Sequence, residues 1–207
     1  MITVWGNADS VNVQKVLWCL AEIGLPHRRI DAGRHYGVVD TPAFLALNPN
    51  GLVPTIDDDG FVLWESNAIV RYLAARYAEA SLWPVDVRTR AEADRWMDWT
   101  QSTLWPSLVP LFRAIMRTPV AERDIVAIRH LADEAIPVIA ILDAHLATHD
   151  YIAGDAFTMG DIAVGCSIWR WFDLPLQRPP FAHVARWFDA LATRAAYRKI
   201  VMVALTT

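Results

Sequence analysis

The sequence contains few cysteines and no surplus of basic residues. Its two cysteines, Cys19 and Cys166, are too few for a disulfide framework or a four-cysteine zinc site. Lysine and arginine together number 19 against 23 aspartates and glutamates, which leaves a formal net charge of -4. Proteins that bind nucleic acid normally carry an excess of positive charge. The composition therefore disfavours a nucleic-acid partner.

Long apolar runs are also missing. No stretch of about 18 uncharged apolar residues occurs, so the sequence predicts no transmembrane helix and no membrane partner. The first residues, MITVWG, lack the basic flank and the apolar run of a secretory signal. From these absences we expect a cytoplasmic protein.

Apolar and aromatic residues are abundant instead. Hydrophobic residues make up 54% of the 207 residues and charged residues 20%, with 10 tryptophans. Typical globular domains have about 45–50% apolar and about 25% charged residues, so this composition excludes a disordered chain. The length allows either one large core or two small domains.

The N-terminal third alternates strand and helix signals. The run 2–5 favours a β-strand, and the apolar residues over 13–23 recur at helical spacing. Gly24 is expected to end this helix, and a weak strand follows at 27–31. Strand, helix and strand within about 30 residues predict a βαβ unit with a parallel pair.

Shorter elements follow. Thr41 and Pro42 open a short helix with proline at its first position. The runs 54–56 and 61–64 predict two strands joined by the turn DDDG. Ser66 is expected to cap a further helix. The predicted order is βαβ-αββα, a small mixed sheet with helices on it.

The pattern changes near residue 80, beyond which no convincing strand occurs. Residues 80–87 are expected to be a linker between a small α/β domain at 1–79 and an all-helical domain at 88–207. The amphipathic helical stretches of the second domain are 88–116, 120–148, 159–173 and 181–194, with a shorter one to about 201.

Three motifs follow one another along the chain: NPNGLVP at 48–54, ESNAI at 65–69 and GDAFTMGDI at 154–162. Together they resemble motifs of the glutathione S-transferase family. The first resembles the loop that ends in a cis-proline before the third strand, the second the glutathione-binding turn that enters the third helix, and the third the capping box of the helical domain. With the domain order, the resemblance covers nearly the whole chain.

The resemblance is closest to serine-type, theta- or phi-like bacterial members of the cytosolic family. It implies a thioredoxin-like fold for the first domain and a glutathione transferase activity used in detoxification. It also implies a homodimer.

The third motif has a structural interpretation of its own. Thr158 and Asp161 have the spacing of a capping box, in which the threonine oxygen accepts an amide hydrogen bond and the acid side chain returns one. We expect this pair to stabilise a helix and assign it no chemistry.

The other two motifs carry the expected glutathione site. By resemblance, the peptide bond between Val53 and Pro54 is cis, and the Val53 backbone pairs with the cysteinyl part of glutathione like an added strand. Spacing alone leaves a trans proline that starts an edge strand equally open. Glu65 and Ser66 lie at a helix N-terminus, which favours an anion, and are expected to bind the γ-glutamyl group. A serine N-cap beside a solvated acid is the plainer alternative.

The glycyl end of glutathione lacks its usual partner. The family often has Lys, Arg or Gln where this chain has Leu52. By resemblance, we expect Arg34 or His35, in the loop after the second strand, to replace that contact.

Family members place a Tyr, Ser or Cys just after the first strand to stabilise the glutathione thiolate. Ser10 is therefore the catalytic candidate, and Asn12 is the reserve because it lies in the same segment and also donates hydrogen bonds. Without the family context, an N-cap is an equally good interpretation of Ser10.

Aromatic residues of the helical domain suggest an apolar pocket for an electrophile. The expected lining residues are Trp105, Leu108, Phe112 and Trp169, although packing is the commoner use of such side chains. His145 and His149 are four apart, a spacing that binds metals, but no adjoining Glu supports a metal site. We expect glutathione as co-substrate and no metal.

The sequence thus predicts a homodimeric enzyme that activates the glutathione thiolate for attack on an apolar electrophile. Two alternatives stay open at this point. One is a non-catalytic ligand-binding or scaffold protein with the same fold, which Leu52 and Asp9 favour. The other is a glutathione-dependent isomerase or dehalogenase, because substrate choice resides in the variable pocket.

Overall fold

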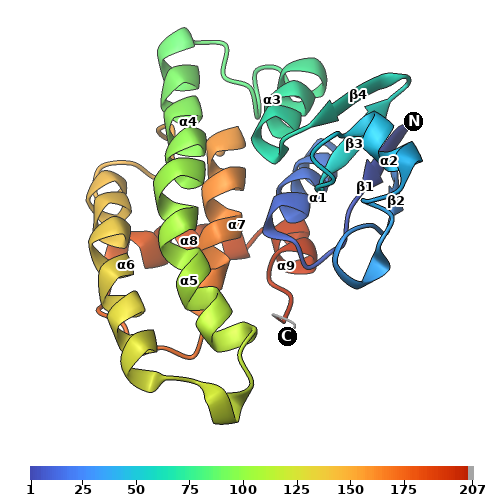
Figure 1. The fold of residues 1–207 in the computed structure, drawn as a ribbon. Coiled ribbons are helices and arrows are strands. Elements are labelled where there is room, and N and C mark those ends of the chain that lie inside the picture. Colours follow the sequence, from blue (N-terminus) through green and yellow to red (C-terminus); the bar gives the residue numbers. More distant parts are fainter. Residues whose placement is uncertain (205–207) are drawn as a thin grey trace. The chain divides into compact units, whose positions relative to one another are not determined.

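The chain forms two compact units, each with its own core. The computed structural model describes residues 1–204, and the boundary between the units falls between Trp83 and Pro84. Figure 1 shows a small sheet with helices in the first unit and helices alone in the second. The predicted fold class, a thioredoxin-like α/β unit followed by a helical unit, is confirmed.

A four-stranded mixed sheet forms the centre of the first unit, in the order β2-β1-β3-β4. The strands are β1 (Ile2–Trp5), β2 (His27–Ile30), β3 (Thr55–Asp58) and β4 (Phe61–Trp64). β1 pairs in parallel with β2, as the βαβ pattern predicts, and antiparallel with β3. β3 and β4 form the predicted hairpin.

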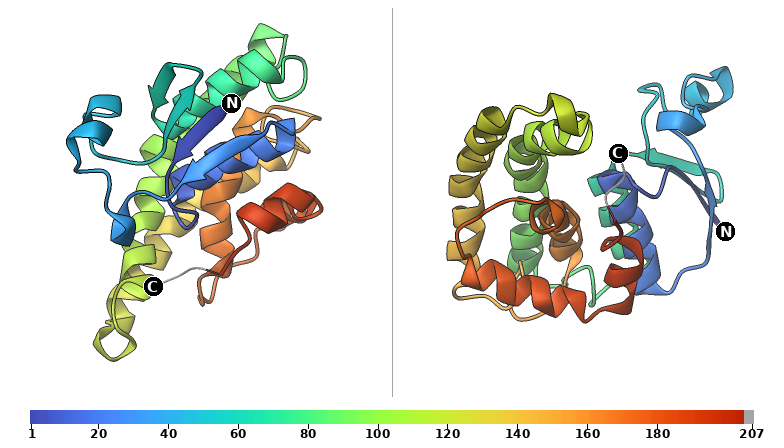
Figure 2. Two further views of the ribbon diagram at one scale, coloured as in Figure 1. Left: turned by 90° about the vertical axis from the view of Figure 1, so that its right-hand side faces the viewer. Right: turned by 90° about the horizontal axis from the view of Figure 1, so that it is seen from below.

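Two long helices cover one face of this sheet. α1 (Val11–Ile23) and α3 (Ser66–Tyr77) lie side by side on that face (Figure 2). Their facing side chains form the core with the central strands, and these fully buried residues include Val4, Val16, Leu20, Ile56, Ile69 and Leu73. Gly24 ends α1 in the left-handed conformation, with φ of 72°, which glycine adopts without steric cost. A 3₁₀ turn, η1 (Arg34–Tyr36), and α2 (Pro42–Leu47) connect β2 to β3.

The register of the sheet brings four loops together at one end of its strands, which we call the sheet edge. Trp5 at the end of β1 pairs with both Ile30 and Thr55, and Thr55 pairs with Trp64. The ends of β1, β2 and β4 and the beginning of β3 therefore share one edge. The segments next to these residues include every expected glutathione contact.

The second unit is a helical bundle. Its helices are α4 (Val87–Trp99), α5 (Trp105–Met116), α6 (Ile125–Leu146), α7 (Met159–Asp173), α8 (Ala182–Ala192) and α9 (Ala195–Ile200). α7 packs against α4 and α5, and α6 packs against α5 and α8. Within the described residues, no helix is long and apolar enough to cross a membrane.

Two helical stretches differ from the sequence expectation. The stretch 88–116 contains a π-helical segment, η2 (Thr100–Leu104), between α4 and α5. The hydroxyl of Thr100 donates to the Trp96 carbonyl over 2.8 Å at this point. The stretch 120–148 begins with a 3₁₀ turn, η3 (Val120–Glu122), and α6 starts only after Asp124, because that carboxylate accepts the first free amides of the helix.

Candidate glutathione site

Ser10 is the N-cap residue of α1, but its side chain makes no capping hydrogen bond. Its backbone carbonyl accepts from the Gln14 amide over 2.9 Å, and its own amide donates to the Asn7 carbonyl over 3.3 Å. The hydroxyl is therefore held at the positive end of a helix without being used by it. This is the arrangement that a thiolate donor needs.

Asn12, the reserve candidate, contacts another member of the predicted site. Its Oδ1 atom accepts a hydrogen bond from the Ser66 hydroxyl over 3.2 Å. Ser66 is buried and begins α3, whereas Asn12 lies in the first turn of α1. The two helix N-termini are thus joined by one side-chain bond.

The N-cap of α3 is Glu65, not Ser66 as the sequence predicts. Glu65 has φ of 72°, a value that is unfavourable for any residue with a Cβ atom. This backbone places Ser66 at the first helical position, where its amide is one of the free donors of the helix. Glu65 itself is exposed.

The Val53–Pro54 peptide bond is cis, as the motif predicts. The buried Asn48 side chain fixes the loop by donating to the Leu52 carbonyl over 2.8 Å and to Thr55 over 3.1 Å. Within residues 1–204, the Val53 amide and carbonyl have no hydrogen-bond partner. Val53 thus presents a backbone donor and acceptor in the manner of a strand edge.

Asn7 is a buried polar residue beside the candidate site that the sequence analysis did not identify. It is almost fully buried, and its Nδ2 atom donates to the Ala32 carbonyl over 3.4 Å. A Cβ atom added to Gly33 would lie 3.6 Å from this nitrogen and 3.2 Å from a Val53 methyl. Asn7 therefore connects the loop after β1 to the loop after β2, and Gly33 of the second loop lies close to Val53. The glycine at position 33 is the signal in the sequence that could have indicated this close approach, and its φ of 78° is a conformation that glycine adopts without steric cost.

Arg34 and His35 lie in η1 and are exposed. The Arg34 guanidinium is 3.5 Å from the Asp9 carboxylate. Asp9 beside Ser10 would oppose an anion at the start of α1, and this ion pair reduces that effect. Leu52 is 65% exposed and supplies no charge to the same region.

Lys15 is a second buried residue beside the candidate site that the sequence analysis did not identify. Only 1% of it is exposed, and its ammonium lies 3.4 Å from Oδ1 of Asn67. Asn67 follows Ser66 in the first turn of α3. This hydrogen bond connects α1 to the first turn of α3.

The expected electrophile residues all belong to the helical unit. Leu108 is fully buried, whereas Trp105, Phe112 and Trp169 are partly exposed. α5 packs against α7, and the Trp169 indole donates to the Val203 carbonyl over 3.1 Å. The Arg117 guanidinium lies over the Phe112 ring at 5.4 Å.

The predicted capping box is confirmed as a structural device. Thr158 and Asp161 exchange the two expected hydrogen bonds at the start of α7. Asp161 also accepts from the Ile152 amide over 2.9 Å and from the Trp187 indole over 2.8 Å. Its complete burial raises the pKa of the carboxyl to about 6, although these donors oppose the shift.

No cluster of three or more potential metal ligands occurs in the part of the chain that the structure describes. His145 and His149 stack with ring centroids 4.2 Å apart. His145 makes a hydrogen bond to the Ile152 carbonyl over 2.9 Å through Nε2. The pair therefore has a packing role beside the capping box.

Known proteins share both units of this chain. The family model of the glutathione S-transferase N-terminal domain matches residues 9–76, and that of the C-terminal domain matches residues 125–190. The chain is 45% identical to glutathione S-transferase GstB of Escherichia coli K12 over 98% of its own length and 99% of that protein. Identity to glutathione S-transferase 3 of Zea mays is 31%, covering 97% and 93%.

A solved structure agrees closely with this one. The theta class glutathione S-transferase of Xanthomonas axonopodis pv. citri, crystallised with glutathione bound, superposes with a TM-score of 0.94 and 48% identity, over 99% of each chain. The structure of the same protein without ligand superposes with a TM-score of 0.86. The chain belongs to the glutathione S-transferase family.

Proposed function

We propose that this glutathione transferase binds glutathione at the sheet edge of its first unit and uses Ser10 to stabilise the thiolate. The observation that carries this role is the Ser10 hydroxyl, which stands at the N-terminus of α1 without capping it. A hydroxyl in that position donates to a negatively charged sulfur, while the helix amides favour the same charge.

The hydrogen bond and the helix N-terminus are together strong enough to lower the pKa of the glutathione thiol as far as activation requires. A thiol with a pKa near 8.5 is only about 3% ionised at pH 7, and lowering that pKa by about two units raises the fraction to roughly three quarters. Two units correspond to about 2.7 kcal/mol. A hydrogen bond to a charged acceptor contributes about 1.5–3 kcal/mol, and a helix N-terminus about 0.3–1 kcal/mol. One donor at a helix N-terminus therefore supplies the whole shift.

The rest of the tripeptide has matching partners along the same edge. The Val53 backbone donor and acceptor suit the cysteinyl peptide unit. The Ser66 amide suits the γ-glutamyl carboxylate, while its hydroxyl donates to Asn12, and the exposed Glu65 suits the γ-glutamyl ammonium. Arg34, with His35 beside it, is our candidate for the glycyl carboxylate, since Leu52 cannot form an ion pair.

The electrophile is an apolar molecule that contacts the partly exposed rings of Trp105, Phe112 and Trp169. Leu108 supports this surface from the core. With an aryl halide, a sulfur lone pair forms the new carbon–sulfur bond and the halide leaves with the electrons of its bond to carbon. The thiol proton has already passed to solvent.

We also propose a cytoplasmic homodimer. Phe61 and Trp64 on the outer strand β4 are 48% and 38% exposed, and aromatic groups on an edge strand favour association with a second copy. Cys19 and Cys166 are buried and form no disulfide within the described residues, which suits a reducing compartment. Light scattering of the wild type and of Phe61→Glu tests the association. Two chains per particle for the wild type and one for the variant are expected, and a wild-type monomer would contradict it.

The experiment for Ser10 compares two serine variants. Turnover of glutathione with a chromogenic aryl halide is measured for the wild type, Ser10→Ala and Ser81→Ala, whose exposed serine lies outside the sheet edge. The thiolate absorbance of bound glutathione is titrated with pH for each. Ser10→Ala is expected to lower kcat and raise the thiol pKa by about one to two units. Equal titrations for all three proteins would remove Ser10 from this role.

A further inference from the structure

A separate cavity lies at the end of the sheet opposite the sheet edge, where Ile2 begins β1 and Asp58 ends β3. Its volume is about 340 Å³, at the lower end of the range for small-molecule sites. We call it the N-terminal pocket; it is lined by Met1, Ile2, Leu25, Pro26, Asp58, Asp59 and Tyr77. All these residues belong to the first unit, and none belongs to the proposed glutathione site.

One lining carboxylate is buried and charged. Only 3% of the Asp58 side chain is exposed, and its Oδ2 atom accepts from the hydroxyls of Tyr72 over 2.7 Å and Tyr77 over 2.6 Å. The Nε atom of Arg76 lies 3.5 Å from the same oxygen. Burial opposes ionisation, but these three groups outweigh it and hold the pKa of the carboxyl below its ordinary value. Asp58 is therefore negatively charged at neutral pH.

Asp58 keeps one carboxylate oxygen without a donor. Each of its three partners approaches Oδ2, and Oδ1 accepts no hydrogen bond from residues 1–204. A buried carboxylate oxygen that lacks a donor costs free energy. Because Asp58 lines the pocket, a ligand there can supply the missing hydrogen bond.

A second carboxylate of the pocket is exposed. The Oδ1 atom of Asp59 accepts from the Met1 ammonium over 2.7 Å, and 80% of this side chain is exposed (Figure 1). The lining groups thus comprise two carboxylates and one ammonium, which leaves one net negative charge. Arg76 pairs with Asp58 through Oδ2 and does not line the pocket. The charge of the lining therefore favours a cation.

The remaining wall is apolar. Ile2, Leu25 and Pro26 line the pocket together with the ring of Tyr77. A metal ion would need more oxygen ligands than two carboxylates provide and would leave this wall in contact with water. An ammonium group on an apolar carbon skeleton would cover the wall and donate to Asp58 at the same time.

We propose that the N-terminal pocket binds a primary amine that carries an apolar group, at a site separate from those for glutathione and the electrophile. Its ammonium donates to Oδ1 of Asp58 and to Asp59, and its apolar group covers Leu25 and Pro26. The plainer role of Asp58 is to anchor the β3–β4 hairpin to α3 through the two tyrosines. That role uses Oδ2 alone and requires neither Oδ1 nor the apolar wall.

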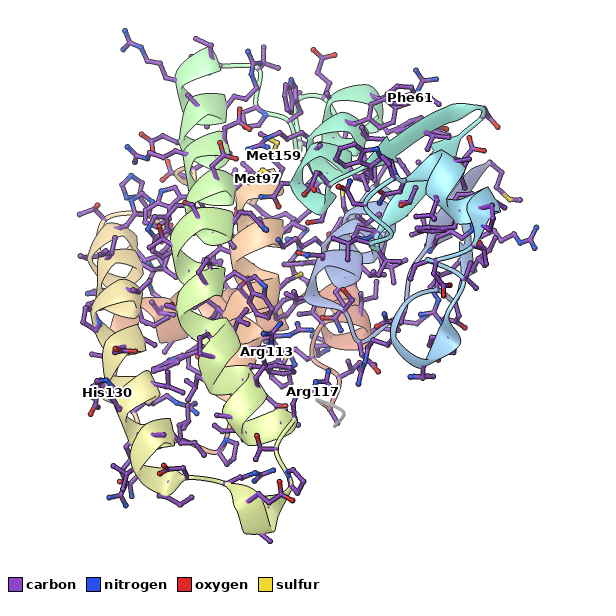
Figure 3. The ribbon with its side chains drawn as sticks, in the orientation of Figure 1. Phe61, Met97, Arg113, Arg117, His130 and Met159 are labelled. Carbon is purple, nitrogen blue, oxygen red and sulfur yellow. The ribbon has the colours of Figure 1, made fainter. Side chains whose placement is uncertain are left out.

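The test uses 2-phenylethylamine as the probe, with 2-phenylethanol as its uncharged analogue and 3-phenylpropanoate as its anionic analogue. Titration is followed through the methyl signal of Met1, and the fully buried Met97 and Met159, labelled on helices of the second unit in Figure 3, are internal controls. The amine is expected to shift the Met1 signal alone and to bind about tenfold or more tightly than either analogue. Its affinity is expected to fall with added salt. Equal affinities for the three compounds would contradict a cation site.

Two aspartate variants of one turn locate the site. Asp58→Asn also weakens the anchor to α3, so Asp59→Asn is the principal variant. Asp59 has φ of 49°, a conformation in which asparagine is common, and this substitution therefore retains the turn. Asp59→Asn is expected to weaken binding of the amine by about three- to tenfold, while Asp57→Asn, outside the pocket, leaves it unchanged.

Both variants are expected to keep wild-type turnover of glutathione, so this result is independent of the Ser10 experiment. Equal affinities for 2-phenylethylamine in the two variants, or a Met1 signal that the amine does not move, would overturn the proposal.

Discussion

The Ser66 hydroxyl donates to Oδ1 of Asn12 over 3.2 Å, between residues 54 positions apart in the chain. The bond joins the first turns of α1 and α3, which carry the proposed thiolate donor and the proposed γ-glutamyl donors. We therefore propose that Asn12 acts on the site through Ser66, as a positioning residue. The sequence left open a role for it as thiol donor.

Asn12→Ala is expected to raise the KM for glutathione by about two- to tenfold and to change kcat by less than about twofold, because one net hydrogen bond is lost. Steady-state kinetics with Ser66→Ala and the double variant complete a cycle. The two effects should be less than additive, since both substitutions remove the same bond. A lower kcat with an unchanged KM would instead make Asn12 the thiol donor.

Arg34 and Asp9 are expected to have opposite effects on glutathione binding. Arg34→Gln removes the proposed partner of the glycyl carboxylate and should raise the KM severalfold. Asp9→Asn removes a competing carboxylate 3.5 Å from the Arg34 guanidinium and should lower it. Arg28→Gln, an exposed arginine of β2, is the control. A KM that rises equally in the Arg28 and Arg34 variants would exclude a specific contact.

Asp161 is expected to make stability depend on pH in an unusual direction. Burial raises its pKa to about 6 in the folded protein, above about 3.9 for an unperturbed aspartate. The folded state therefore holds this proton more tightly, so the contribution is complete below about pH 4 and is lost as the pH rises through about 6. The stability of the wild type relative to Asp161→Asn should fall by about 2–3 kcal/mol between pH 4 and pH 7. Urea unfolding of both proteins measures this, and a pH-independent difference would contradict it.

His145 is expected to make stability depend on pH in the direction opposite to that of Asp161. Burial lowers its pKa in the folded state, and the neighbouring His149 lowers it further. The neutral form is therefore favoured on folding, and the stabilising contribution present above about pH 6.5 is lost as the pH falls through the folded pKa. Proton NMR titration of the His145 ring signals should give a midpoint below about 6.5, the ordinary pKa of histidine. A midpoint at or above that value would contradict this prediction.

The sequence predicted more of the fold than of the site geometry. The strands at 2–5 and 61–64 and the helix at 159–173 have the predicted bounds, because strong local signals define them. The interruption at Thr100 and the late start of α6 were missed. Their apolar spacing remains helical across both places, so periodicity alone does not report the change.

The residues of the candidate site also divide into those that local patterns predicted and those that they did not. The family resemblance predicts Ser10, Val53 and Ser66 as site residues, because each occupies a fixed place in a local pattern. Asn7 and Lys15 were missed because each is a polar residue in a segment with no pattern of its own. Their partners, Ala32 and Asn67, lie 25 and 52 positions away.

The amino-acid order alone determined the two kinds of unit, the parallel strand pair and the presence of a helix N-terminus after β1, since propensity, periodicity and turn chemistry are local properties. Only the tertiary structure decided that the Ser10 hydroxyl is left unused by α1, that Asn12 bonds Ser66, and that Asp9 pairs with Arg34. The register of the sheet brings these groups to a common edge. Distance along the chain does not encode such proximity.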